Sequence, residues 1–258
     1  MRASRGVSPI DDIRSSASPA DVVPVPARGA LDRHRILAEA VAFVDELGLQ
    51  QLTMRRLGQR LGVEAMSLYR YVDGREDLLD GMVEHVLAGL DVDPHLRLLP
   101  TDGWQAFLQR LAHGVREIAL AHPKVFPLVA TRHPAAPWLR PPLRSLDLVE
   151  AFLEGLVDRG FDDEAAVAAY RAFSSFLLGH LLLEVSALGA GTGPAEEPLA
   201  DGTDAGSDSP RDEAGADEQL AGHRNLQRLE RLLSQDRSQA EFEVSLESLL
   251  QRLELTLG

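Results

Sequence analysis

The chain has 258 residues, 45% of them hydrophobic, with a net charge of −14 and no cysteine. This length and apolar content suffice for one large core, or for a small domain beside a larger one. The lack of cysteine excludes disulfides and thiolate metal sites, and no run approaches the roughly 18–20 apolar residues of a membrane span. We therefore expect a cytoplasmic protein with no membrane partner.

The first structured region is predicted over 29–90, after an N-terminal arm. The arm, residues 1–28, is rich in Ser, Pro, Ala, Asp and Arg and holds no apolar segment of the kind found in signal peptides, so we expect it to be disordered. Apolar residues at helical spacing follow it, punctuated by Gly48, Gly62 and Gly74. The predicted helices span 32–47, 53–61, 64–71 and 75–90.

The segment 53–75 is basic although the chain is acidic. It holds five arginines against Glu64 and Asp73, and Gly62 makes a tight turn between two short helices. A helix-turn-helix places its second helix in the major groove of DNA, and it needs such a turn, small or polar residues at the groove and donors for phosphates. The spacing favours this reading and leaves open an ordinary helical pair with a solvated basic face. The arginines of the arm (Arg2, Arg5, Arg14 and Arg28) offer a further DNA contact.

Beyond a proline-containing linker at 91–101, the pattern is helical and shows no strand alternation. A second domain is predicted over 100–258, interrupted at 190–218 by an acidic loop. That loop holds nine acidic residues against Arg211 and is expected to be disordered. The helices predicted in this domain lie near 103–121, 124–131, 138–159, 163–189, 218–234 and 238–256.

Two of these helices suggest a bundle between subunits. Residues 165–188 are apolar nearly all round, and the last helix carries a regular row of leucines. A helix of this kind is buried on two sides, whereas a helix at the edge of a core needs only one apolar stripe. We expect a homodimer; the alternative is a monomer with two deeply buried helices.

The stretch from Leu31 to Leu87 resembles the N-terminal domain of TetR-type transcriptional repressors. The matching segments are Leu52-Thr53-Met54-Arg55-Arg56-Leu57, Leu61-Gly62-Val63, Ser67-Leu68-Tyr69-Arg70-Tyr71-Val72 and Asp77-Leu78-Leu79-Asp80. The helix order, the late loop and the segments Trp104–Leu108 and Thr131-Arg132 look like the tetracycline-repressor subgroup, whose C-terminal half dimerises and binds an inducer. The resemblance implies an all-α fold, with an N-terminal three-helix helix-turn-helix domain and a C-terminal helical ligand-binding and dimerisation bundle.

The same resemblance assigns DNA contacts to eight positions. Arg55, Ala65, Met66 and Ser67 are implied to face bases, and Thr53, Tyr69, Tyr71 and Arg75 to bind phosphates. Tetracycline repressors have a proline where Met66 stands and a histidine where Tyr71 stands. We therefore expect the mode of binding to be kept and the operator sequence to differ.

The implied effector site lacks the groups that hold a metal. In tetracycline-binding members a histidine three residues before the Thr-Arg pair coordinates a drug-bound Mg²⁺, and Leu128 stands at that position here. Other polar drug contacts align with Leu111 and Val115, and an acid from the partner subunit aligns with Leu183, next to Glu184. Aliphatic side chains cannot ligate a hard cation, so we expect no metal and no cofactor.

What remains is an apolar cavity with a few polar groups, suited to a small hydrophobic effector held by one or two hydrogen bonds. Its expected lining is Leu111, Val115, Phe126, Leu128, Thr131, Arg132, Trp138 and Phe173, and His113 or His180 is a further candidate donor. The alternative is that these side chains simply fill the core.

The chain shows no motif for catalysis, such as a zinc-protease helix, a phosphate-binding lysine loop or a nucleophile elbow. We expect no enzyme. The sequence favours a homodimeric repressor that leaves a palindromic double-stranded DNA operator when a small molecule binds. The alternative is a dimeric ligand-binding or adaptor protein that keeps the fold without binding an operator.

Overall fold

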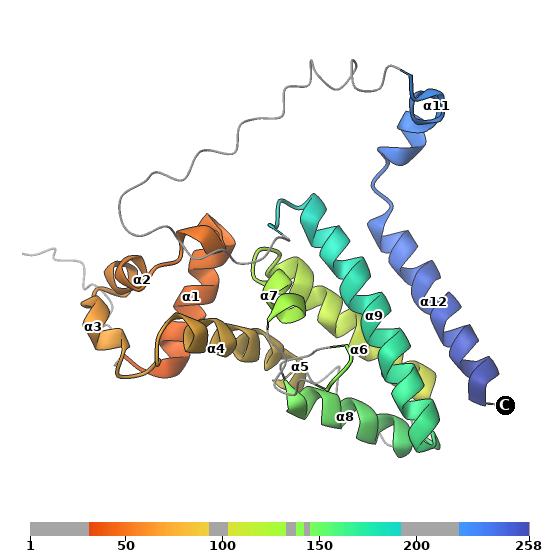
Figure 1. The fold of residues 1–258 in the computed structure, drawn as a ribbon, viewed down its shortest axis with the longest axis horizontal. Coiled ribbons are helices and arrows are strands. Elements are labelled where there is room, and N and C mark those ends of the chain that lie inside the picture. The colour runs from red at the N-terminus through yellow and green to blue at the C-terminus, as the bar shows by residue number, and fades with distance from the viewer. Residues whose placement is uncertain (1–30, 93–102, 133–137, 142–144, 192–221, 258) are drawn as a thin grey trace, which may run out of the picture. The chain divides into compact units, whose positions relative to one another are not determined.

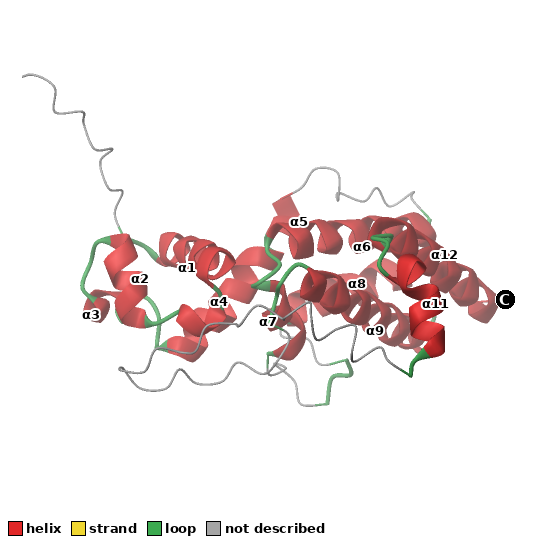
Figure 2. Cartoon of the chain, turned by 90° about the horizontal axis from the view of Figure 1, so that it is seen from above, coloured by secondary structure: helices red, strands yellow, loops and turns green. Residues whose placement is uncertain are grey.

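A computed structural model describes residues 31–92, 103–132, 138–141, 145–191 and 222–257. Within these ranges all regular structure is helical, as the all-α prediction requires (Figures 1 and 2). The predicted arm and nearly all of the predicted acidic loop lie outside the described residues.

The N-terminal helices are α1 (Arg33–Leu47), α2 (Met54–Leu61), α3 (Ala65–Leu68) and α4 (Arg75–Leu87), with a 3-10 turn η1 (Leu49–Gln51) after α1. The carboxylate of Asp32 caps α1 by accepting a 2.8 Å hydrogen bond from the backbone N–H of Arg35. Helix α1 packs against α2 and α4, and α2 packs against α3. The fully buried side chains of this core include Ile36, Val44, Leu52, Leu57, Leu68 and Met82.

Two predicted helix ends in this region are wrong. The third helix was expected to reach residue 71, but α3 ends at Leu68, and residues 69–71 form turns. The fourth was expected to reach residue 90, but α4 ends at Leu87 and a separate short helix, α5 (Gly89–Val92), follows it. Glycine has a low helix propensity, which explains why the helix is interrupted near Gly89.

The C-terminal helices are α6 (Trp104–Ala121), α7 (Phe126–Thr131), α8 (Leu146–Val157), α9 (Asp163–Ala187), α11 (Arg224–Leu233) and α12 (Ser238–Leu257). Helix α9 is the central element, because it packs against α6, α7, α8 and α12 (Figure 1). Helices α4 and α5 meet this group through α4 with α6 and α7, and through α5 with α6.

The helix predicted over 138–159 begins later than expected. Residues 138–141 form turn and bend structure, and α8 starts at Leu146, capped by the Ser145 hydroxyl, which accepts a bond from the backbone N–H of Leu148. Pro141 explains part of the difference, since proline has no N–H to donate and keeps the residue before it out of the helical region.

Helix α9 is long and apolar enough to cross a membrane by length and composition, which corrects the expectation that no segment approaches such a span. Core helices of soluble proteins pass the same test, and 39% of the apolar window is buried inside this chain. One stripe, including Ala169, Phe173 and Leu177, faces the core, while Leu183 is 76% exposed. Within a single chain the helix is therefore buried on one side only, unlike the deeply buried helix of the monomer alternative.

Candidate functional site

The turn between α2 and α3 depends on two glycines. Gly62 ends α2 in the left-handed conformation, at φ 73°, which glycine adopts without strain. A Cβ atom at Gly58 would lie 2.9 Å from the backbone oxygen of Val63 and 3.2 Å from the backbone nitrogen of Ala65. The sequence pattern pointed to Gly62 as the turn but not to Gly58. A glycine in the interior of a helix, where its propensity is poor, was the available signal.

Helix α3 presents its predicted base-facing residues at an exposed end of the helix pair. Met66 is 74% exposed, an unusual position for a large apolar side chain, whereas Leu68 is fully buried and anchors the helix. Ala65 and Ser67 are partly exposed. The predicted phosphate contacts Tyr69 and Tyr71, on the turn that follows, are 46% and 37% exposed.

Two of the five arginines in this segment are held against α1. Arg60 pairs with Glu39 and with Glu46, the latter at 2.6 Å, and its guanidinium lies 5.6 Å from the ring centroid of Phe43. Arg56 stacks on the same ring at 5.5 Å. Such cation–π contacts and ion pairs hold α2 on α1 and leave less of this charge for a nucleic acid.

The other three arginines differ in their partners. Arg75, predicted to bind phosphate, donates a hydrogen bond to the backbone oxygen of Leu52 and so joins α4 to the start of α2. Thr53, also predicted to bind phosphate, caps α2 by accepting from the backbone N–H of Arg56 at 3.2 Å. Arg55 and Arg70 are exposed and make no hydrogen bond or ion pair within the described part of the chain. Arg70 was not among the predicted contacts.

A bidentate ion pair fixes the turn that carries the tyrosines. The guanidinium of Arg33 donates to both carboxylate oxygens of Asp77 at 2.8 Å, and also to the backbone oxygen of Tyr71 at 2.8 Å. The hydrogen bonds from Arg33 are the main reason that the pKa of Asp77 is lowered, and the backbone N–H of Asp73 adds to the effect. The turn at 71–73 is thereby tied to both α1 and α4.

A cavity of about 50 Å³ lies among α6, α8 and α9 and is also lined by one residue each from α4 and α7, Leu87 and Val129. Three predicted effector contacts, Leu111, Val115 and Phe173, line it. Its remaining lining residues are Leu148, Val149, Phe152, Tyr170, Ser174, Leu177 and Leu178.

The other predicted effector contacts lie elsewhere. Phe126 and Leu128 are buried in α7 but do not line this cavity, and the hydroxyl of Thr131 donates to the backbone oxygen of Pro127 at 2.8 Å. Trp138 is 78% exposed and is absent from the lining, which corrects its assignment to an enclosed pocket. It stands in the turn structure that replaces the predicted helix start, so the helical register used to place it inward does not apply.

Two polar groups at this cavity were not predicted. Ser174 is buried, at 7% exposure, and Tyr170 donates from its hydroxyl to the backbone oxygen of Pro141 at 3.0 Å. Burial raises the pKa of Tyr170 to about 12, so the phenol stays neutral. Both residues lie on the inward stripe of α9 that also carries Phe173, and this shared stripe was the signal available in the sequence.

Arg132 joins α7 to α4 instead of pointing into the cavity. Its Nη2 and Nε donate to Oδ1 of Asp80 at 2.6 and 2.9 Å, and its Nη1 donates to Glu76 at 2.8 Å. The side chains of Arg132 and Asp80 are only 10% and 14% exposed, whereas that of Glu76 is 73% exposed. The pair with Asp80 is therefore the buried part of the link between α7, beside the cavity, and α4, and the pair with Glu76 is its exposed part.

Neither Leu183 nor Glu184 serves as the acid that tetracycline-binding members contribute from the partner subunit. Leu183 is exposed, and Glu184 accepts a 3.1 Å hydrogen bond from Nε of Arg116, whose guanidinium lies 5.1 Å from the ring of Phe242. The side chains of Arg116 and Glu184 are 13% and 7% exposed. Glu184 thus serves a buried ion pair that joins α6 and α9 beside α12. In the described ranges no group of three or more His, Asp or Glu residues is placed to hold a metal.

The C-terminal domain matches a known family model. Residues 98–257 match the tetracyclin repressor-like C-terminal domain. The chain is 34% identical over 160 residues to the class E tetracycline repressor protein of Escherichia coli, which covers 61% of this chain and 70% of that protein.

Solved structures share the fold over most of the chain. A possible TetR family transcriptional regulator from Streptomyces coelicolor A3(2) matches with a TM-score of 0.65 and 30% identity, over 87% of this chain and 100% of that one. ActR from Streptomyces coelicolor, in complex with actinorhodin, matches with a TM-score of 0.63 and 25% identity, over 89% and 98%. Since the family model alone covers more than half of its length, the chain belongs to the TetR family of transcriptional regulators.

Proposed function

We propose that this regulator is a cytoplasmic homodimeric repressor that binds a palindromic operator and leaves it when a small hydrophobic molecule enters the C-terminal domain. The observation that carries the proposal is the buried link between Arg132 and Asp80, because it connects α7, beside the cavity, to α4, which supports the helix-turn-helix. A change at the cavity then reaches the DNA-reading helices through a packed, charged contact.

The operator is read by a domain that we place at 29–90. Arg55, Ala65, Met66 and Ser67 are proposed to meet base edges, and Tyr69 and Tyr71 to bind phosphates. Arg55 is exposed on α2, and α3 and the turn after it are exposed at one end of the helix pair. Arg70, exposed and without an internal partner in the described residues, is added to the phosphate contacts. Thr53 and Arg75 are also proposed to bind phosphates. Thr53 caps α2 in addition, and Arg75 in addition donates to the backbone oxygen of Leu52.

The effector is proposed to enter the cavity of the domain at 100–258. Small-molecule sites have volumes of roughly 300–1,000 Å³, so a cavity of about 50 Å³ must widen before such a molecule fits. Leu87 of α4 is part of its wall, and widening that displaces Leu87 would also move α4. The complex of ActR with actinorhodin supports a small-molecule effector in this family. The lining, apolar apart from Ser174 and Tyr170, favours a hydrophobic one.

The test is selection of operator fragments from the genome that encodes the protein, followed by fluorescence anisotropy with the selected duplex at rising salt. A dimer should select two half-sites about one helical turn (~34–36 Å) apart. Affinity should fall by roughly 10³–10⁵ between 50 and 200 mM salt if each dimer neutralises several phosphates. Failure to select any duplex, or binding that ignores salt, would instead support the dimeric ligand-binding or adaptor protein.

A further inference from the structure

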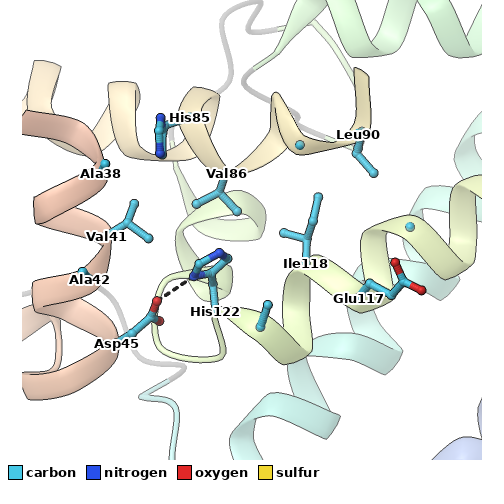
Figure 3. A pocket seen from close by; sticks show the side chains of 13 residues that line it. Ala38, Val41, Ala42, Asp45, His85, Val86, Leu90, Glu117, Ile118 and His122 are labelled. Atoms are coloured by element: carbon cyan, nitrogen blue, oxygen red, sulfur yellow. Dashed lines mark hydrogen bonds and ion pairs between the residues drawn. The ribbon is translucent and has the colours of Figure 1, made fainter. Parts of the chain in front are cut away.

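A second and larger hollow lies between α1, α4, α5 and α6 (Figure 3). Its volume is about 510 Å³, within the range of small-molecule sites, and it shares no lining residue with the effector cavity. Its apolar wall is built from four elements, by Val41 of α1, Val86 of α4, Leu90 of α5 and Ile118 of α6. A ligand seated here would touch both the DNA-binding helices and the first helix of the C-terminal domain.

The lining carries two carboxylates and two histidines. Asp45 of α1 and Glu117 of α6 contribute the carboxylates, and that of Asp45 is paired with His122. Among the described residues, no arginine or lysine lines the hollow. His85 of α4 is also present, but burial, together with the nearby His34 and His122, lowers its pKa and favours the neutral imidazole. The hollow therefore favours a positive ligand charge over a negative one.

Asp45 has one buried carboxylate oxygen that no donor of the described residues satisfies. Its Oδ2 lies 2.6 Å from Nδ1 of His122, an interaction that joins α1 to the end of α6 (Figure 3). Its Oδ1 is buried and has no hydrogen-bond partner among the described residues. A buried acceptor without a donor costs free energy, so a donor brought in by a ligand would remove a cost that the chain bears alone.

We propose that this hollow is a binding site for a compact amphipathic organic cation, distinct from the effector cavity. The ammonium group of the ligand donates to Oδ1 of Asp45 after a small shift of the side chain, and Glu117 adds negative potential from the α6 side. The apolar body of the ligand packs on Val41, Val86 and Ile118. The proposal concerns binding alone and does not depend on operator recognition.

The first experiment compares three ligands that share one apolar cage and differ in charge: 1-adamantylamine, 1-adamantanol and 1-adamantanecarboxylate. Each is titrated into the full-length protein without DNA, by calorimetry and by thermal melting. We expect the amine to bind at least about tenfold more tightly than the alcohol, as one ion pair in a partly buried site allows, and to raise the melting temperature. Equal binding of the carboxylate, or no binding of the amine at millimolar concentration, would overturn the proposal.

The second experiment places the amine. Ala42→Phe fills the hollow from the exposed side of α1 and should abolish amine binding. Glu117→Gln should weaken it severalfold, whereas Glu154→Gln, the same change on an exposed position of α8, should not. Asp45→Asn would also disturb the contact with His122, so the location of the amine is tested with the Ala42 and Glu117 variants instead.

The effector cavity provides the competing location. Leu111→Trp fills that cavity and should leave the affinity for the amine unchanged if the amine occupies the hollow. Loss of binding in Leu111→Trp together with full binding in Ala42→Phe would assign the amine to the effector cavity and refute the second site. Circular dichroism and melting of each variant separate lost binding from lost folding.

Discussion

Arginine side chains in the helix-turn-helix are chemically alike but differ in what they contact. Arg56 and Arg60 lie over Phe43, and Arg75 donates to the backbone oxygen of Leu52, so these three stabilise the domain. Arg55 and Arg70 are exposed without such partners in the described residues. The sequence predicted that the segment is basic. Which of its arginines contact the protein and which stay exposed depends on tertiary contacts, and a local sequence pattern does not report these.

Replacing Arg70 or Arg55 by alanine should therefore weaken operator binding in two different ways. Arg70→Ala removes a proposed phosphate contact, so affinity should fall alike for all sequences and the salt slope should drop by about 0.9 per site. Arg55→Ala should cost roughly 1–3 kcal/mol on the preferred operator and relax selection at one base pair. Anisotropy titrations on operator and scrambled duplexes, at several salt concentrations, measure both effects.

Arg60→Ala is the matched control for these two variants. Its guanidinium already pairs with Glu39 and Glu46, so its removal should lower the melting temperature without changing the salt slope. If Arg60→Ala flattened the slope and Arg70→Ala did not, the assignment of free and internally held charges would be wrong.

At the scale of elements, the approach of α3 to α2 depends on Gly58. In Gly58→Ala the new methyl group meets the backbone of Val63 and Ala65, which cannot rotate away as a side chain would. We expect a loss of about 1–3 kcal/mol in the free energy of unfolding, as for overpacked sites, and weaker operator binding because α3 is displaced. Chemical denaturation and anisotropy measure the two.

Gly89→Ala is the comparison for that prediction. Among the described residues, a Cβ atom there would meet only Cδ1 of Ile118, at 4.0 Å, which is ordinary contact. Alanine at this position should be neutral or stabilising, since it favours helix by about 1 kcal/mol over glycine. Equal losses in the two variants would show that the close approach at Gly58 is not the cause.

Arg132 links α7 to α4 through two ion pairs that we expect to contribute unequally to stability. Arg132→Ala removes the ion pair with Asp80, whose side chain is only 14% exposed, and should cost about 2–4 kcal/mol, as broken buried pairs do. Glu76→Gln should cost less than about 1 kcal/mol, because Glu76 is a solvent-exposed partner. Denaturation gives the energies, and hydrogen exchange should show faster opening of α4 in Arg132→Ala alone. Identical behaviour of the two variants would contradict this ranking.

Periodicity and glycine positions predicted most helices well, because each has one buried stripe and defined ends. The start of α8 was misplaced, since helical spacing of apolar residues continues through Pro141 while the backbone does not. The cavity was predicted only in part. Leu111 and Phe173 line it, as predicted. Arg132 was also expected there, but it pairs with Asp80 and Glu76 of α4, which are distant in sequence. Such long-range pairs cannot be read from local spacing.

For the whole molecule, the lining predicts a ligand unlike that of the tetracycline repressors. Leu128 is buried and apolar, and Glu184 is held by Arg116, so neither offers a ligand for Mg²⁺. We expect tetracycline with Mg²⁺ neither to raise the melting temperature nor to release operator DNA, whereas some hydrophobic compound without metal does both. Calorimetry with and without Mg²⁺ tests this, and micromolar, magnesium-dependent tetracycline binding would refute it.

Leucine and valine side chains that are exposed on α9 and α12 make the stability of the proposed dimer depend on protein concentration. Leu183, Val244 and Leu255 are 76%, 64% and 83% exposed in a single chain. In the proposed dimer their burial adds to the free energy of folding only when two chains meet, so unfolding of the dimer costs about 1.4 kcal/mol more for each tenfold rise in concentration. The number of copies in a cell would thus set both how many operators are filled and how long each molecule survives proteolysis.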